Sequence, residues 1–358
     1  MSVKPLLIVV PGIICYKMLS RQGFSTLSTL EGHKAGCYCA PVNFLVTGGA
    51  GFIGSHVCQE LLNRGHSVCA FDDLNDFYDP NLKRGNLREL QSLGKPFEFI
   101  FGALTDDEAI AEVFASAQFD QIIHLGARAG VRPSLAEPAL YQRVNVEGTV
   151  NILEAARARR IKKITIASSS SVYGVNSKVP FAETDPIFAA ISPYAASKLA
   201  CEALGHVYHH VYGMDVVMLR FFTVYGPRQR PDLAIRKFAE LIDAGKKIPV
   251  FGDGSTARDY TYVTDILQGV MACTEREFGY EIFNLGESQT VTLSRLIELL
   301  ETSLGKKALI DRQPMQPGDV PLTCADISKA REKLGYQPRT KIEQGIPLFV
   351  DWLRRKVT

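Results

Sequence analysis

Tyr194 and Lys198 lie four residues apart in the stretch SPYAASK, and this pair is the first candidate for proton-transfer chemistry. If the stretch is helical, a spacing of four places both side chains on the same face. A neighbouring ammonium group stabilises the phenolate form of a tyrosine, which makes the phenol a better base. The pair therefore predicts that Tyr194 acts as a general base, with Lys198 as its cationic neighbour.

A serine cluster precedes this pair in the stretch ASSSSVYG, at the end of an apolar run that predicts a strand. Ligands bind at the carboxyl ends of strands in open parallel sheets. Ser169 is therefore expected to donate a hydrogen bond to the oxygen that Tyr194 deprotonates. A tyrosine and lysine at this spacing also occur on ordinary amphipathic helices, so the serine cluster is what favours catalysis.

A glycine-rich turn with Gly48, Gly51 and Gly54 follows the first predicted strand and opens a predicted helix. Glycines allow a tight turn and a close backbone approach to a pyrophosphate, and the helix start offers unpaired N–H groups. The first helical residues, Phe52 and Ile53, belong to the same predicted dinucleotide site. Lys198 is then expected to bind the nicotinamide ribose as well.

Asp72 stands at the end of the second predicted strand. A carboxylate at that point hydrogen-bonds the adenosine ribose hydroxyls and repels a 2′-phosphate, which favours NAD over NADP. Asp73 is the alternative ribose ligand, and either residue also suits a loop cap.

Strands alternate with helices from residue 42 onward, which predicts an α/β fold with a Rossmann-type, doubly wound parallel sheet. The predicted strands are 42–49, 66–73, 97–104, 119–127, 161–170 and 213–226, with helices at 55–65, 106–117, 145–160 and around Tyr194. Later segments are rich in proline and glycine. We predict an N-terminal extension at 1–41, an NAD-binding domain at 42–222 and a smaller mixed α/β nucleotide-sugar region at 223–358. The last boundary is soft, because a strand from beyond it is free to return to the sheet.

Composition restricts the partners. The 358 residues have a formal net charge of +2, which gives no reason to expect nucleic acid. Eight scattered cysteines suggest free thiols in a reducing compartment, and Cys37 and Cys39 have no second pair to complete a metal site. We therefore expect a cytoplasmic protein without a metal. The apolar run at 6–16 is too short to span a bilayer, so 1–41 is either an extension without structure or an anchor or targeting segment.

These motifs together resemble the extended short-chain dehydrogenase/reductase family. The longer strings FDDLNDFYDPNLK, ARAGVRPS, RFFTVYGPRQRPD and MQPGDVPLTCAD are similar to those of UDP-glucuronate 4-epimerases. The resemblance covers roughly residues 42–355. It implies an NAD-dependent enzyme that epimerises a UDP-sugar at C4 through a transient 4-keto sugar, and a homodimer that packs through the Tyr194 helix.

The resemblance also assigns roles by position. Ser169 matches the catalytic serine, and Asn145 matches a structural position beside the cofactor. The substrate positions that it implies are Thr223, Arg258, Tyr260 and Asp319. Two departures are Gln316, where UDP-galactose epimerases have a phosphate-binding arginine, and Ala103, where the family usually has an aspartate that touches the adenine.

A glucuronate substrate needs donors for its C5 carboxylate, and serine hydroxyls and an arginine are suitable. The candidates are Ser170, Ser171, Arg230 and Arg132, of which Arg230 matches the acid-binding arginine of the glucuronate epimerases. Related dehydratases and decarboxylases have acidic residues after the catalytic serine, where this chain has Ser170 and Ser171. Epimerisation of UDP-glucuronate is thus favoured. A UDP-hexose or UDP-N-acetylhexosamine 4-epimerase, a UDP-glucuronate decarboxylase and a non-catalytic NAD-binding regulator remain as alternatives.

Overall fold

The computed structural model describes residues 9–10, 13–14, 40–176, 178–187, 189–315 and 320–357. The chain divides into two units, Met1–Ala40 and Pro41–Thr358. In the first unit, β1 (Val9–Val10) pairs antiparallel with β2 (Ile13–Ile14). The expectations about Cys37, Cys39 and most of the extension lie outside the described residues. In the part of the chain that is described, no helix is long and apolar enough to cross a membrane.

The second unit is built on a seven-stranded sheet in which every pair of neighbours is parallel. Its strands, in spatial order, are β12 (Tyr280–Leu285), β8 (Asp215–Phe221), β7 (Lys163–Ser169), β6 (Gln121–His124), β3 (Asn43–Thr47), β4 (Ser67–Asp72) and β5 (Phe97–Phe101). The chain order reverses between β3 and β6. The predicted doubly wound sheet is thereby confirmed, and the crevice beside β3 and β6 is where such sheets bind ligands.

Helices cover both faces of this sheet, because successive strand residues point to opposite sides. Phe44 and Val46 belong to one buried core, and Leu45 belongs to the other. The first core includes side chains of α1 (Phe52–Asn63), α9 (Val263–Thr274) and α11 (Ser328–Leu334). The second includes side chains of α3 (Asp107–Ser116), α6 (Gly148–Ala158) and α7 (Pro193–Tyr212).

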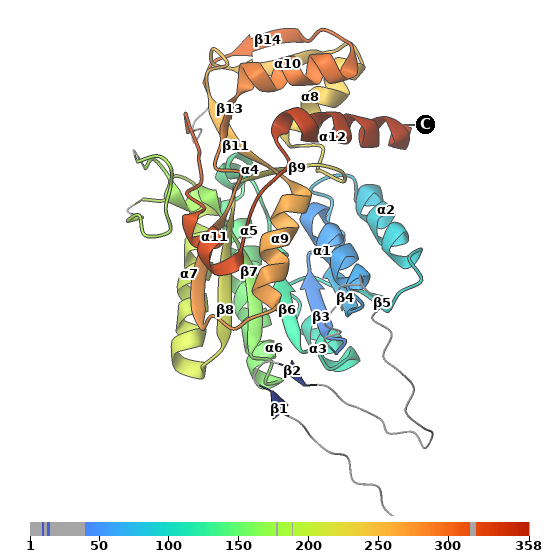
Figure 1. The fold of residues 1–358 in the computed structure, drawn as a ribbon, viewed down its shortest axis with the longest axis vertical. Coiled ribbons are helices and arrows are strands. Elements are labelled where there is room, and N and C mark those ends of the chain that lie inside the picture. The colour runs from blue at the N-terminus through green and yellow to red at the C-terminus, as the bar shows by residue number, and fades with distance from the viewer. Residues whose placement is uncertain are drawn as a thin grey trace, which may run out of the picture. The chain divides into compact units, whose positions relative to one another are not determined.

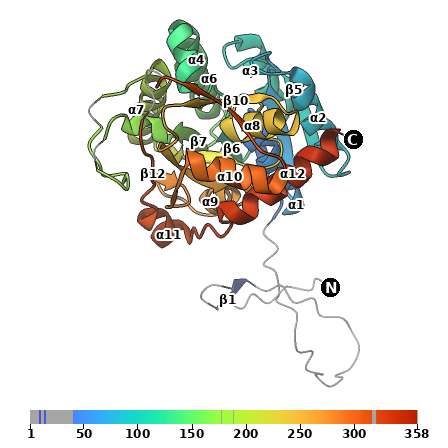
Figure 2. The ribbon, with the colours of Figure 1, turned by 90° about the horizontal axis from the view of Figure 1, so that it is seen from above.

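A smaller mixed region lies at one end of the sheet (Figure 1). Its strands form a three-stranded sheet of β13 (Thr290–Thr292), β11 (Ala257–Tyr262) and β9 (Thr223–Tyr225), and a parallel pair of β10 (Lys247–Phe251) and β14 (Leu309–Gln313). Its helices are α8 (Ala234–Asp243), α10 (Leu293–Leu304) and α12 (Ile342–Val357). Viewed from above, α10 and α12 lie side by side (Figure 2). These elements enclose a third core with Phe238, Leu300 and Phe349.

One predicted strand is wrong. The run 213–226 is not a single strand but splits into β8 and β9, which belong to different sheets. At the break, the Phe222 N–H donates to Leu285 O of β12 (3.1 Å), and the chain then leaves the main sheet to pair with β11. The strand β12 lies beyond residue 223 and still pairs with β8. The division into domains at 222/223 stays a prediction.

Candidate active site

A cavity with a volume of about 390 Å³ lies at the switch point of the sheet. It is lined by segments that follow β3 to β7, by the start of α7 and by the loop before α8. The structure brings many of the predicted residues together along its wall, namely Gly48, Gly51, Phe52, Ile53, Gly54, Asp72, Ser169, Ser170, Ser171, Tyr194, Lys198, Thr223 and Arg230. Its size is that of a small-molecule site.

The glycine-rich turn leaves no space for larger residues. A Cβ atom on Gly54 would lie 2.1 Å from the carbonyl oxygen of Gly48, which is closer than any real contact. Gly48 itself has φ of +67°, a conformation that glycine adopts without strain. The hydrogen-bonded ladder of α1 begins where Ser55 N–H donates to Gly51 O (3.0 Å), so the N–H groups of residues 52–54 precede it. These groups can bind an anion.

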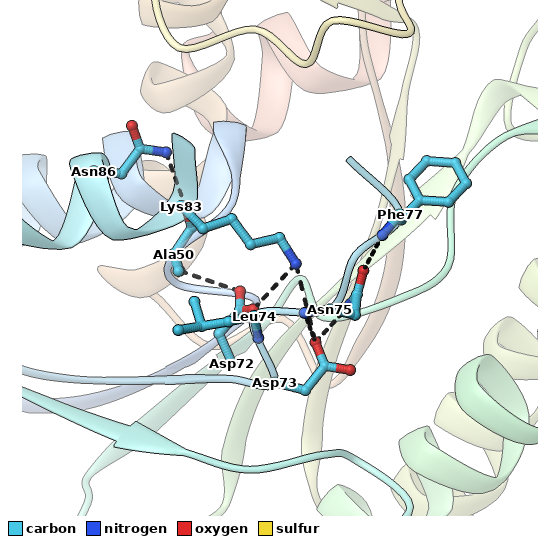
Figure 3. A network of polar contacts seen from close by, with 8 residues as sticks. All are labelled: Ala50, Asp72, Asp73, Leu74, Asn75, Phe77, Lys83 and Asn86. Carbon is cyan, nitrogen blue, oxygen red and sulfur yellow. Dashed lines mark hydrogen bonds and ion pairs between the residues drawn. The ribbon is translucent and has the colours of Figure 1, made fainter. Parts of the chain in front are cut away.

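Asp72 lies at the end of β4 within a polar network (Figure 3). Its Oδ1 accepts from Leu74 N–H (2.9 Å) and from Lys83 Nζ (3.4 Å), and its Oδ2 accepts from Ala50 N–H (3.3 Å). Burial raises the pKa of the Asp72 carboxyl, while the charge of Lys83 opposes this. Asp73 accepts from the Asn75 N–H (3.1 Å) as a loop cap and also lines the cavity.

Lys83 is a functional candidate that the sequence reasoning missed. It comes from α2 (Pro80–Gln91), a helix that was not predicted, and it is only 4% exposed. Its Nζ lies between Asp72 and Asp73, 3.4 and 4.0 Å from the nearest oxygen of each. The signal that was available is a lysine four residues after Asp79, a helix N-cap, in the string YDPNLK.

The Tyr194 pair lies in the first turns of α7. Ser192 caps the helix by accepting from Ala195 N–H (3.1 Å), and Pro193 occupies the first turn. Lys198 is 5% exposed, and its Nζ donates to Ala167 O at the end of β7 (2.7 Å). This bond fixes the ammonium at the carboxyl edge of the sheet, where Tyr194 also lines the cavity.

The serines follow β7 and open the short 3-10 helix η2 (Ser170–Tyr173). Ser169 Oγ accepts from Ser171 N–H (3.2 Å) and donates to Ser171 Oγ (3.1 Å). Ser168 instead points into the interior, where its hydroxyl donates to Glu202 (2.5 Å). Glu202 in turn forms a two-bond ion pair with Arg220 of β8, with distances of 2.8 and 2.7 Å. This buried pair ties α7 to the strands below the serines.

His124 forms hydrogen bonds that link the end of β3, before the glycine turn, to α6. The single hydroxyl proton of Thr149 donates to Asn145 O (2.6 Å), so the His124 Nε2–H must donate to Thr149 Oγ (3.1 Å). Its Nδ1 then accepts from Thr47 Oγ (2.7 Å), next to the glycine turn. Burial, followed by the charge of Lys198, lowers the pKa of His124 to about 3. The imidazole is therefore neutral near pH 7.

Asn145 holds the loop after β6. It belongs to the π-helix η1 (Gln142–Glu147), and its Oδ1 accepts from Arg128 N–H (2.7 Å) while its Nδ2 donates to Arg128 O (3.0 Å). Nδ2 also donates to Ser197 Oγ of α7 (2.9 Å). Asn145 is thus placed as a support for a cavity wall, and Arg128, which lines the cavity, is a second residue that the sequence reasoning missed.

A smaller cavity of about 180 Å³ shares Ser170, Ser171 and Thr223 with the larger one and is also lined by Arg258. Tyr260 does not line either cavity. It is buried in the third core, with its ring centre 6.5 Å from that of Tyr225.

Arg132 does not line either cavity. Its guanidinium lies 4.5 Å from the centre of the Phe251 ring. Asp319 and Gln316 lie outside the described residues. All role assignments in this site remain predictions.

Comparison with known proteins decides the family. Residues 45–348 match the family model described as GDP-mannose 4,6 dehydratase. The UDP-glucuronate 4-epimerase of Thermodesulfobacterium geofontis is 42% identical over 315 residues, which covers 88% of this chain and 97% of the relative. The chain belongs to the extended short-chain dehydrogenase/reductase family. Within that family the enzyme is a nucleotide-sugar 4-epimerase, which is an isomerase.

Solved structures agree with this placement. The enzyme is 35% identical to the Bacillus cereus UDP-glucuronic acid 4-epimerase in complex with UDP-glucuronic acid and NAD, with a TM-score of 0.82 and coverage of 88% and 99%. It is 34% identical to a UDP-glucose 4-epimerase of Thermotoga maritima in complex with UDP-glucose, with a TM-score of 0.81 and coverage of 88% and 100%. The family uses NAD. The relatives therefore include enzymes that act on acidic and on neutral sugars.

Proposed function

We propose that this enzyme interconverts UDP-glucuronate and UDP-galacturonate, with NAD held in the larger cavity. The observation that supports an acidic substrate is Arg230, which lines the same cavity as Tyr194 and Ser169. A carboxylate at C5 of a sugar lies one carbon from the reacting C4, so its partner must stand close to the catalytic base. Arginine is the residue best suited to bind a carboxylate with two hydrogen bonds.

The residues around the cavity fit NAD. The glycine turn and the free N–H groups of residues 52–54 suit a pyrophosphate, and the carboxylate of Asp72 suits ribose hydroxyls. When bound, NAD supplies a reversible acceptor for the hydride of C4. Ala103 lines the cavity on the Asp72 side, so the site has a methyl group where the family usually has an adenine-binding aspartate.

The chain's own residues move the proton. Tyr194 takes the proton of the C4 hydroxyl and gives it back after the 4-keto sugar has turned over. Ser169 turns its hydroxyl proton from Ser171 to the same sugar oxygen and donates a hydrogen bond there, and Lys198 stabilises the phenolate. Lys198 is well placed for this role because its bond to Ala167 O holds the ammonium in a buried position.

Ser170 and Ser171 disfavour the decarboxylase alternative. Both residues line the cavity, and they directly follow Ser169 in the sequence. Their hydroxyl groups can bind a carboxylate but cannot transfer protons as a carboxyl group would. Holding the C5 carboxylate by hydrogen bonds opposes loss of CO₂ from the β-keto acid that forms at the 4-keto stage.

The test is incubation with UDP-glucuronate without added reductant, followed by product identification by NMR. We expect UDP-galacturonate and neither UDP-pentose nor CO₂. Arg230→Ala should reduce kcat/KM for UDP-glucuronate by about 100-fold, the loss of a charged hydrogen-bonded pair, and should affect UDP-glucose far less. Arg295→Ala, at an exposed position of α10, is the matched control. Equal losses on both sugars would refute the assignment of the carboxylate, and turnover of UDP-glucose alone would favour a hexose epimerase.

A further inference from the structure

Arg230 is already paired with an acidic residue of its own loop. Asp232 accepts from Arg230 Nε at Oδ1 (2.9 Å) and from Nη2 at Oδ2 (2.8 Å), in a two-bond arrangement. The Arg230 side chain is only 18% exposed, and the Asp232 side chain is 36% exposed. Burial opposes the charge of the arginine, yet the pairing with Asp232 keeps the pKa of Arg230 above its ordinary value. The guanidinium therefore stays charged inside the cavity wall.

The pairing leaves a defined part of the guanidinium for a ligand. A guanidinium has five N–H donors in a planar fork. Asp232 uses the edge formed by Nε and Nη2, so the edge formed by Nη1 and the outer Nη2–H remains for a second carboxylate. The centre of the Phe77 ring lies 5.4 Å from the guanidinium carbon, a contact that attracts the positive charge. Arg230 can thus bind a substrate carboxylate end-on without releasing Asp232.

We propose that Asp232 is a specificity-determining counter-ion that lowers the affinity of the site for an acidic sugar; this inference rests on the proposed function. A substrate carboxylate that meets Arg230 alone meets a full positive charge. With Asp232 in place it meets a neutral pair, and the two carboxylates repel each other across the guanidinium. The attraction between the substrate carboxylate and Arg230 is therefore weaker, although the same edge of the guanidinium forms the hydrogen bonds.

Weaker binding of the substrate carboxylate suits the chemistry of a 4-epimerase. The 4-keto sugar must turn over between the two transfers of hydride, so the contact between Arg230 and the C5 carboxylate has to move once in each turnover, while Ser170 and Ser171 can still hold the carboxylate. A carboxylate bound to an unpaired, buried arginine would resist that movement. Binding energy that is present before the sugar turns and lost while it turns slows that step and lowers kcat. Asp232 removes a part of such binding energy.

The test is Asp232→Asn, which removes the charge while the side chain keeps nearly the same shape. We expect the Kd for UDP-glucuronate, measured by calorimetry on the NAD-loaded protein, to fall about five-fold, which equals about 1 kcal/mol. The Kd for UDP, which has no sugar carboxylate, should change by less than about two-fold, and kcat for UDP-glucuronate should decrease because the sugar turns more slowly. Asp232→Ala should shift the Kd in the same direction.

Glu240→Gln is the matched control, because it removes an equal charge from a nearby arginine pair, Arg236–Glu240 (2.7 Å), on α8. It should leave both Kd values unchanged. If Asp232→Asn weakens the binding of UDP-glucuronate or leaves it unchanged, while Arg230→Ala still discriminates between UDP-glucuronate and UDP-glucose, the inference about Asp232 is wrong and the proposed function stands. If Arg230→Ala affects both sugars equally, the proposed function itself fails.

Discussion

His124 makes the stability of the fold depend on pH. The side chain is 3% exposed, and its pKa is lowered from 6.5 to about 3 by burial and then by the charge of Lys198. The unfolded chain binds a proton as the pH falls below 6.5, whereas the folded chain binds it only near pH 3. Stability is therefore complete above the unfolded pKa, decreases as the pH falls below that value, and stops changing at the folded pKa.

The size of the effect follows from these two values. Between about pH 8 and about pH 5, the unfolded state gains about 2 kcal/mol from protonation of this one imidazole, while the folded state gains almost none. A glutamine at position 124 does not titrate and retains one donor and one acceptor. In His124→Gln, the fall in the free energy of unfolding over this pH range should be smaller than in the wild type by that amount.

The assay is urea denaturation of both proteins at a series of pH values. Comparison of slopes removes the contributions of all other titrating groups. His206→Gln on the exposed face of α7 is the control and should keep the wild-type slope. If His124→Gln shows the full wild-type pH dependence, then the buried imidazole is not neutral in the fold and the hydrogen-bond assignment from Thr47 to Thr149 is wrong.

Two further predictions concern the support of the site. Glu202→Gln leaves Arg220 buried without its counter-charge and should lower the free energy of unfolding by about 3–5 kcal/mol. The double variant, with Leu at position 202 and Met at position 220, should recover most of that loss. Equal losses in the single and double variants would contradict this. Gly54→Ala places a Cβ atom 2.1 Å from Gly48 O and should release the dinucleotide, measured as nucleotide per protein chain after purification, whereas Gly85→Ala on α2 should retain it. Full NAD content in Gly54→Ala would show that the turn can shift.

The homodimer that packs through α7 remains a prediction, as do the roles of Arg132, Tyr260 and Asp319. Arg132 and Tyr260 do not line either of the two cavities described above. Each could therefore contact a substrate only if the substrate extended beyond these cavities.

Local pattern in the sequence determined the sheet and the cofactor turn. The strands β3 to β7 are apolar runs separated by helices. The glycine spacing after β3 indicates a turn in which the backbone approaches a ligand closely. These features depend on neighbouring residues, so they are visible without the fold. The same holds for Tyr194 and Lys198, because a helix brings residues four apart onto one face.

Tertiary structure decided which distant residues meet. The string RFFTVYG has the pattern of one strand, but its first residues pair with β12 and its last residues pair with β11, which divides it at Phe222. Lys83 reaches Asp72 because α2 packs beside α1; the local sequence can predict the helix that carries Lys83, but it does not predict this contact. Asp232 lies two residues from Arg230, yet which edge of the guanidinium it occupies depends on the loop conformation. Periodicity is fixed by neighbours along the chain, whereas such contacts are fixed by packing between elements that are far apart in sequence.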